Sequence, residues 1–140
     1  MKEKVQIKIV NHADINQLVT IYKDAGWWVE GNDSADPSFI QKIIAGSFCF
    51  AVAVYEDKII GMGRSISDGV SDAYIQDVAV LTQYRSQGIG AKIMDEIIGF
   101  LKKKGISWIG LISEPKATSF YTRYGFKEMK DYTPFLFPFK

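Results

Sequence analysis

Two spacings of apolar residues recur along this chain. Apolar residues at every second position, or in short unbroken runs, predict strands, and apolar residues three or four apart predict helices. The chain therefore belongs to the α/β (α+β) class, with the predicted order βααβββαβαββ. The expected elements are Val5–Val10, Asn11–Ala25, Pro37–Ala45, Phe48–Tyr55, Ile59–Ser67, Ala73–Val80, Ile89–Lys104, Ile106–Leu111, Pro115–Tyr124, Phe126–Tyr132 and Phe135–Phe139.

Local signals mark several ends of these elements. Asn11 is the expected N-cap of the first helix, and Gly26 ends that helix. Asp36 is the expected cap of the second helix, with Pro37 at its first position. Two prolines confine the last predicted strand to a sheet edge, because proline donates no backbone hydrogen bond.

The stretch from Ala73 to Lys104 organises the chain. A buried strand leads into a short glycine-containing turn and then an amphipathic helix. Free N–H groups at the start of a helix, together with the helix dipole, suit a pyrophosphate. The Arg85 guanidinium can add a charged fork for the same phosphates. We therefore expect a phosphate site in this turn.

The spacing of the glycines in this turn decides which known phosphate-binding motif it matches. The chain has no P-loop pattern, and a dinucleotide fingerprint would need a third glycine. The pattern Arg85-Ser86-Gln87-Gly88-Ile89-Gly90 instead resembles motif A, R-x-x-G-x-G, of the GNAT superfamily of N-acetyltransferases. The preceding Val78-Ala79-Val80 is similar to the family's fourth strand. The later run from Ala117 to Phe126, ATSFYTRYGF, resembles its motif B.

This resemblance implies one GNAT domain over residues 1–140. Its sheet would be mixed, mostly antiparallel and six- to seven-stranded, with about four helices on its two faces. The cofactor would be acetyl-CoA, whose pantetheine pairs with the fourth strand as a pseudo-strand. The resemblance assigns cofactor binding to ten residues of this strand and turn: Val78, Ala79, Val80, Arg85, Ser86, Gln87, Gly88, Ile89, Gly90 and Ala91.

Tyr121 matches the family's helix tyrosine, which protonates the departing thiolate, and Tyr124 is the fallback. A phenol with an ordinary pKa of about 10 is protonated near neutrality, as an acid must be. The general base stays open, because Tyr74 and Gln76 stand where relatives carry Glu or His. Asp77 faces the opposite side of its strand unless a bulge intervenes. Loop alternatives are Glu30 and Asp68, and Glu114 departs from the asparagine usual in motif B.

The expected reaction is direct attack of a small primary amine on the acetyl thioester. Four residues are candidates for binding this amine: Trp27, Trp28, Glu30 and Tyr74. Some features also resemble serotonin-type acetyltransferases, including Gly26-Trp27, Arg64–Gly69 and Asp77. The alternatives are a protein or peptide amine as acceptor, and a non-catalytic acyl-CoA-binding or regulatory domain.

The composition of the chain limits the classes of binding partner that we expect. With a net charge of +1 among 140 residues, no basic footprint for nucleic acid is present. The single cysteine, Cys49, lies in an apolar strand and predicts a buried thiol, and a metal site is not expected with His12 as the one histidine. No secretion signal or membrane span is recognisable, so we expect a cytoplasmic protein without membrane contact. The apolar segment Phe135–Phe137 makes a homodimer plausible.

Overall fold

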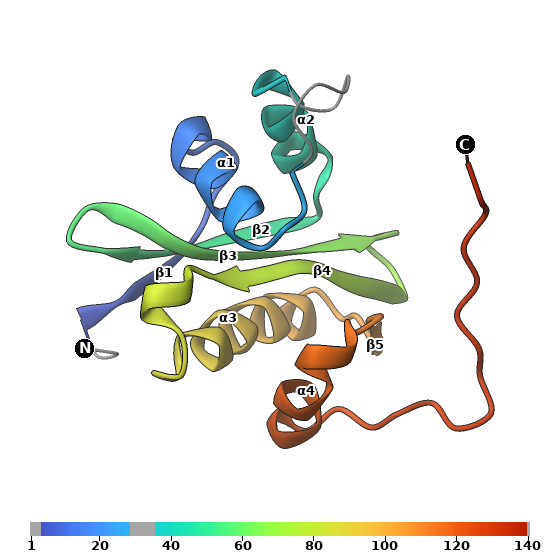
Figure 1. Cartoon of the computed structure of the whole chain (residues 1–140). Coiled ribbons are helices and arrows are strands. Elements are labelled where there is room, and N and C mark those ends of the chain that lie inside the picture. The colour runs from blue at the N-terminus through green and yellow to red at the C-terminus, as the bar shows by residue number, and fades with distance from the viewer. Residues whose placement is uncertain (1–3, 29–35, 140) are drawn as a thin grey trace. The chain divides into compact units, whose positions relative to one another are not determined.

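The computed structural model describes residues 4–28 and 36–139. The chain divides after Gly110 into two compact units, the second of which begins at Leu111. The first unit is a five-stranded sheet with helices on both faces (Figure 1). Its elements are β1 (Gln6–Ile9), α1 (Ile15–Asp24), α2 (Ser38–Gly46), β2 (Cys49–Tyr55), β3 (Lys58–Ser67), β4 (Asp72–Val80), a 3-10 turn η3 (Thr82–Tyr84), α3 (Ile89–Lys103) and β5 (Trp108–Gly110). This order confirms the predicted class and the predicted sequence of elements as far as β5.

The strands lie in the sheet in chain order, β1-β2-β3-β4-β5. The first four are antiparallel, and β5 is parallel to β4, so the mixed and mostly antiparallel sheet is confirmed. The β2–β3 hairpin turns through Glu56 and Asp57, both at positive φ, as in a type I′ turn.

Helices α1 and α2 cover one face of the sheet and α3 covers the other (Figure 1). The predicted apolar face of α3 is buried: Ile89, Ile93, Met94, Ile97 and Leu101. Gly63 lets this helix approach the backbone of β3, because a Cβ at that position would lie 2.9 Å from Ile97 Cδ1 and 3.0 Å from Ile93 Cγ2. Tight packing of α3 on the sheet positions the turn that precedes the helix.

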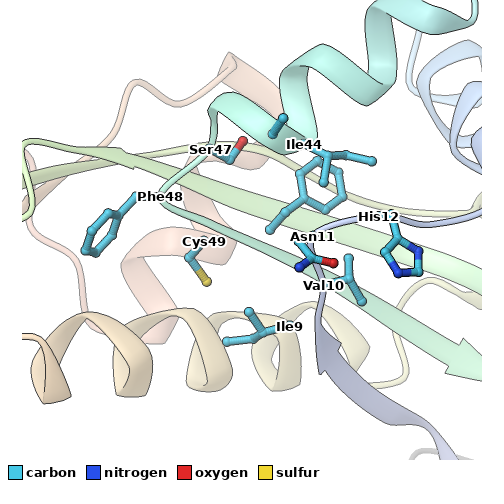
Figure 2. Close-up of a pocket in the computed structure, with 10 residues that line it drawn as sticks. Ile9, Val10, Asn11, His12, Ile44, Ser47, Phe48 and Cys49 are labelled. Carbon is cyan, nitrogen blue, oxygen red and sulfur yellow. The ribbon is translucent and has the colours of Figure 1, made fainter.

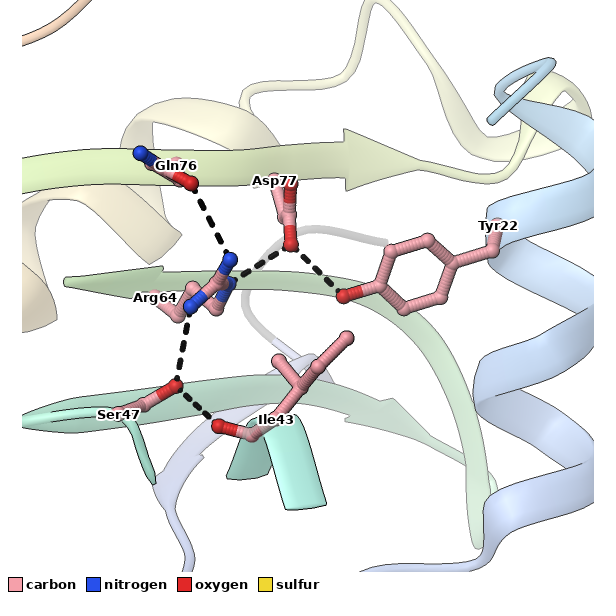
Figure 3. Close-up of polar contacts among 6 residues, drawn as sticks. All are labelled: Tyr22, Ile43, Ser47, Arg64, Gln76 and Asp77. Atoms are coloured by element: carbon pink, nitrogen blue, oxygen red, sulfur yellow. Dashed lines mark hydrogen bonds and ion pairs between the residues drawn. The ribbon is translucent and has the colours of Figure 1, made fainter. Parts of the chain in front are cut away.

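A β-bulge interrupts the pairing of β3 with β4. Met62 lies opposite Ala79 and Arg64 lies opposite Gln76, so β4 has one extra residue between these pairs. The extra residue is accommodated at Asp77, whose φ is +56°. The bulge turns Asp77 toward the α1 face, where the side chains of Arg64 and Gln76 also lie (Figure 3). The sequence predicts Asp77 on the opposite side of its strand unless a bulge intervenes, and this bulge is present.

Strand β4 is paired with β5 only over its first three residues, Asp72–Tyr74. In the described chain, Ile75–Val80 has no further strand pairing on that side, while its other side is paired with β3. The second half of β4 therefore borders the sheet with an open edge.

The second unit begins with a 3-10 turn, η4 (Pro115–Ala117), followed by α4 (Thr118–Tyr124), and Gly125 ends the helix at φ +127°. The predicted hairpin of Phe126–Tyr132 and Phe135–Phe139 is wrong, since neither segment is a strand. The described sheet accordingly has five strands and not six or seven. Prolines at positions 134 and 138 remove donors from the final segment, and a lone two-stranded hairpin is marginally stable in water.

The predicted cap at Asn11 is also wrong. Asp14 is the N-cap of α1, and its carboxylate accepts the Gln17 N–H at 3.2 Å. An N-cap oxygen reaches free amides two or three residues later in the first turn, and Asn11 lies too far before Ile15 for this. Asp36 does accept the Ser38 N–H at 2.9 Å, although Pro37 lies just before the first residue of α2.

Candidate active site

The turn between β4 and α3 presents a row of backbone donors. Within the described residues, the backbone amides of residues 86–91 donate no hydrogen bond to the protein, and the next amide, that of Lys92, donates to the Gly88 carbonyl at 3.2 Å. Gly88, at φ +83°, is the N-cap and supplies no side-chain cap. These six amides lie at the positive end of a 15-residue helix, where they suit an anion.

Arg85 is anchored at the base of this turn. Its Nε donates to the Val80 carbonyl at 2.8 Å, and a terminal guanidinium nitrogen lies 3.4 Å from an Asp24 carboxylate oxygen. The same carboxylate accepts hydrogen bonds from the N–H and hydroxyl of Thr82 at 3.0 Å each. The Arg85 side chain is still 44% exposed, so it can reach a ligand at the turn. Asp24 has no sequence signal of its own, since it looks like an ordinary polar residue in the last turn of a helix.

The cofactor residues suggested by sequence lie together on two adjacent elements. Val78, Ala79 and Val80 end β4 along its open edge, and residues 85–91 follow after η3. An open strand edge can pair with an amide-containing chain, and unbonded amides beside it can accept phosphate. The residues present therefore fit a pantetheine chain ending in a pyrophosphate.

A polar cluster lies on the α1 face beside the bulge (Figure 3). We call Tyr22, Ser47, Arg64, Gln76 and Asp77 the Asp77 cluster. One Asp77 carboxylate oxygen accepts the Tyr22 hydroxyl at 2.8 Å and Arg64 Nε at 2.7 Å. Burial, followed by the Asp77 carboxylate, raises the pKa of Tyr22 far above its ordinary value. The phenol therefore acts as a fixed hydrogen-bond donor.

None of the base candidates in the described residues is an unengaged carboxylate. Asp77 already accepts two hydrogen bonds within its cluster. Asp68 accepts the N–H groups of Val70 and Ser71 at 2.8 Å each, and these bonds hold its pKa below the usual range. Glu30 lies outside the described residues. The general base is therefore still unassigned.

The candidate acceptor residues differ in how they are held. Trp27 is 37% exposed and contacts the Tyr22 ring edge-to-face, with centroids 6.1 Å apart. Trp28 is half-buried. Tyr74 is 48% exposed and packs edge-to-face against Trp108 at 5.2 Å. Neither Trp27 nor Trp28 is a fully buried core residue.

Tyr121 lies on α4 in the second unit, between the rings of Phe120 and Phe126, whose centroids are 5.0 and 5.9 Å from its own. Burial raises the pKa of Tyr121, and the nearby Glu114 carboxylate raises it further. The phenol is therefore protonated throughout the neutral range. The fallback, Tyr124, is half-buried between the same two rings.

A hollow of about 530 Å³ lies away from the turn, between the end of β1, the end of α2 and the start of β2 (Figure 2). His12 and Cys49 are among its lining residues, but no residue of β4 or α3 is. Cys49 is buried as predicted, and burial raises its thiol pKa to about 12. The described residues hold no group of three metal-ligating side chains, and none of the described helices has the length and apolarity that crossing a membrane requires.

Comparisons with known proteins agree with this geometry. Residues 32–135 match the family model "Acetyltransferase (GNAT) domain". An uncharacterized N-acetyltransferase, ycf52, of Pyropia yezoensis is 32% identical, over 89% of this chain and 74% of that protein. GCN5-related N-acetyltransferase 1, chloroplastic, of Arabidopsis thaliana is 40% identical over 67 residues, which span 48% of this chain and only 34% of that protein.

Solved structures share the fold. A GNAT-family acetyltransferase of Streptococcus pneumoniae superposes with a TM-score of 0.81 and 25% identity, covering 97% of this chain and 98% of the other. An aminoglycoside acetyltransferase from a soil metagenome, in complex with sisomicin, gives a TM-score of 0.78 at 22% identity, covering 99% of this chain and 98% of the other. The family match extends over most of the chain and includes the β4–α3 turn. This chain belongs to the GNAT acetyltransferase family.

Proposed function

We propose that this chain is an acetyl-CoA-dependent N-acetyltransferase that acetylates the primary amine of a small molecule. One observation carries the proposal: the unbonded amides of residues 86–91 follow the open edge of β4 after the short turn η3. The open strand edge can pair with a ligand that carries amides, and the anion site beyond it can bind a pyrophosphate farther along the same ligand.

The chain's own residues then divide the work. Backbone groups of Val78 and Val80 pair with the pantetheine amides, and the amides of residues 86–91 bind the pyrophosphate. Arg85, already beside the turn, adds positive charge. Acetyl-CoA, when bound, would supply an acetyl thioester. The amine nitrogen would form a bond to the carbonyl carbon and lose one proton to solvent, and the carbon–sulfur bond would break to release a thiolate.

Tyr121 is the proposed acid that gives its phenolic proton to the leaving sulfur. Its raised pKa keeps the proton available at neutral pH. Because a thiol of ordinary pKa near 8.5 already leaves fairly well, we expect Tyr121→Phe to lower turnover only about tenfold. Coenzyme A affinity, measured by calorimetry, should stay the same. Unchanged turnover in this variant would remove Tyr121 from the mechanism.

A small amine is proposed as acceptor because an exposed Trp27 can form an aromatic wall for a cationic or aromatic amine. Two similar proteins are named for small-molecule amine acceptors: Serotonin N-acetyltransferase 2 of rice and the aminoglycoside acetyltransferase. A third, Histone acetyltransferase TAP1 of soybean, points instead to a protein amine.

The deciding experiment is release of free thiol from acetyl-CoA with a panel of arylalkylamines, polyamines, aminoglycosides and peptides. Turnover with a small amine, with mass spectrometry showing one added acetyl group on nitrogen, is the expected result. Turnover on peptides alone would favour the protein-amine alternative. Tight coenzyme A binding with no turnover on any amine would favour a non-catalytic acyl-CoA-binding domain.

We also propose that the C-terminal segment contacts a second copy of the chain. Four apolar side chains in the described tail are 74–92% exposed: Phe135, Leu136, Phe137 and Phe139. Exposed apolar runs of this kind mark protein interfaces. Light scattering should then show a dimer that Phe135→Ser with Phe137→Ser converts to a monomer. A monomeric parent chain would overturn this proposal.

A further inference from the structure

Asp77 has a backbone conformation that is unusual for a strand residue. Its φ of +56° lies in the left-handed region, which residues with a side chain enter at a steric cost. Such a conformation persists only when its surroundings hold it in place. Asp77 comes directly before Val78–Val80, so its conformation sets the direction in which that segment leaves the bulge.

The surroundings that hold Asp77 are the other members of its cluster. Its Oδ2 accepts one hydrogen bond from α1, through Tyr22, and one from β3, through Arg64. Arg64 also donates to Gln76 Oε1 at 3.1 Å, so the same guanidinium contacts the bulge residue, Asp77, and the residue that precedes it (Figure 3). The Arg64 and Asp77 side chains are only 14% and 23% exposed, which limits screening by water. Charge-assisted hydrogen bonds in such a setting are among the stronger ones.

Tyr22 has a second contact, on its other side. Its ring meets Trp27 edge-to-face, and its carbonyl accepts the Trp27 N–H at 2.9 Å. One tyrosine therefore contacts both the bulge of the proposed cofactor strand and a tryptophan of the proposed acceptor wall.

We propose that Tyr22 and Asp77 are positioning residues for acyl transfer. Asp77 holds the bulge so that Val78–Val80 presents its backbone to the acyl-CoA, and Tyr22 keeps Trp27 aligned with that strand. This inference rests on the function proposed above, and it assigns a role to a carboxylate that does not itself take the proton of the amine.

Three variants separate the carboxylate from the backbone conformation. Asp77→Gly keeps the left-handed φ at no steric cost but removes the carboxylate, and Asp77→Asn keeps an acceptor without the charge. Tyr22→Phe removes one donor to Oδ2. We expect the Kd of acetyl-CoA to rise about tenfold in Asp77→Gly, and about three- to fivefold in Asp77→Asn and Tyr22→Phe. Tyr55→Phe, which removes a β2 hydroxyl outside the cluster, is the matched control and should leave Kd unchanged.

Affinity and steady-state kinetics are measured below each variant's unfolding midpoint, with circular dichroism as the check of folding. A merely structural role would lower that midpoint and leave Kd and both KM values unchanged, which would overturn the proposal. Tyr22→Phe should raise the KM of the amine as well as that of acetyl-CoA. If Tyr22 acts through Asp77 on the cofactor strand, adding Tyr22→Phe to Asp77→Gly should not weaken acetyl-CoA further.

The parent chain distinguishes the two proposals. If it binds and turns over acetyl-CoA while the cluster variants match it in Kd and KM, only the positioning role fails. If the parent chain itself does not bind coenzyme A or acetyl-CoA, the proposed function fails and the positioning role fails with it.

Discussion

The β4–α3 turn and the Asp77 cluster lie at either end of the segment Val78–Val80. They differ in whether their polar groups are hydrogen-bonded within the protein. In the turn, the backbone amides of residues 86–91 have no acceptor among the described residues. In the Asp77 cluster, the carboxylate oxygen and the guanidinium are bonded to each other and to their neighbours. The turn leaves backbone donors open, whereas the cluster pairs its charged groups with each other.

This difference distinguishes a region suited to binding a ligand from a region that stabilises the fold. Unbonded donors at an exposed turn are hydrated and can be transferred to a ligand at little cost, whereas a satisfied, half-buried cluster loses free energy if any member is removed. The two arginines follow the same division, because the Arg85 side chain is 44% exposed and that of Arg64 is 14% exposed. We therefore expect substitutions in the turn to act mainly on affinity, and substitutions in the cluster to lower stability and, through the geometry of β4, affinity as well.

The largest expected effect is at Gly88. A valine there would be strained at φ +83° and would place its methyl groups among the amide donors. Gly88→Val should weaken acetyl-CoA binding about a hundredfold, measured by calorimetry. Gly99→Ala is the control within the same helix, since a Cβ there meets nothing within 4 Å and alanine should stabilise the helix slightly. Equal affinity in both variants would contradict an anion site at the turn.

Arg64→Ala should mainly affect stability. It leaves the half-buried Asp77 carboxylate without its cationic partner, and we expect the free energy of unfolding to fall by about 2 kcal/mol. Urea denaturation of the variant and the parent chain measures this difference. A loss below 0.5 kcal/mol, roughly the worth of an exposed pair, would show that the cluster does not hold the fold.

Alkaline pH gives a further test of the cluster. The folded pKa of Tyr22 is raised, so above pH 10, about the ordinary tyrosine pKa, the unfolded chain loses a proton that the folded chain keeps. Stability should therefore decline with rising pH, by at most about 1.4 kcal/mol per pH unit from this residue. Tyr22→Phe should remove that part of the slope between pH 10 and 11. Parallel curves for the two proteins would contradict the buried phenol.

The smallest expected effect is at Arg85. Arg85→Ala removes a 2.8 Å hydrogen bond to the Val80 carbonyl and a 3.4 Å contact with Asp24. Both are open to water, so stability should change by less than about 1 kcal/mol. Coenzyme A affinity should fall about fivefold, and the loss should shrink at high salt. Titrations at low and high ionic strength measure both. A stability loss as large as that of Arg64→Ala would erase the distinction between the two arginines.

Short-range patterns predicted most of the first unit. The apolar spacing of α3, the unbroken run of β2 and the turn Arg85–Gly90 each depend on residues close in sequence, and the structure has these elements where they were expected. The final hairpin was wrong because a strand also needs a partner, and alternation in Phe126–Phe139 says nothing about whether one is available.

Such short-range patterns could not predict contacts between residues that are far apart in the sequence. Tyr22 and Asp77 are 55 residues apart in sequence, and Asp24 and Thr82 are 58 apart. The bulge at Asp77 could be named only as a condition, because a single strand does not reveal the register of its neighbour.

The order of elements as far as β5, the turn Arg85–Gly90 and the membership of a family were already present in the linear pattern of residues. The open edge of β4, the reorientation of Asp77 and its bonds to Tyr22 and Arg64 were decided only when the strands paired and α1 packed on the sheet. The physical reason is range: periodicity and capping are set by neighbours within one or two turns, while strand register and charge pairing depend on which distant groups are brought into contact.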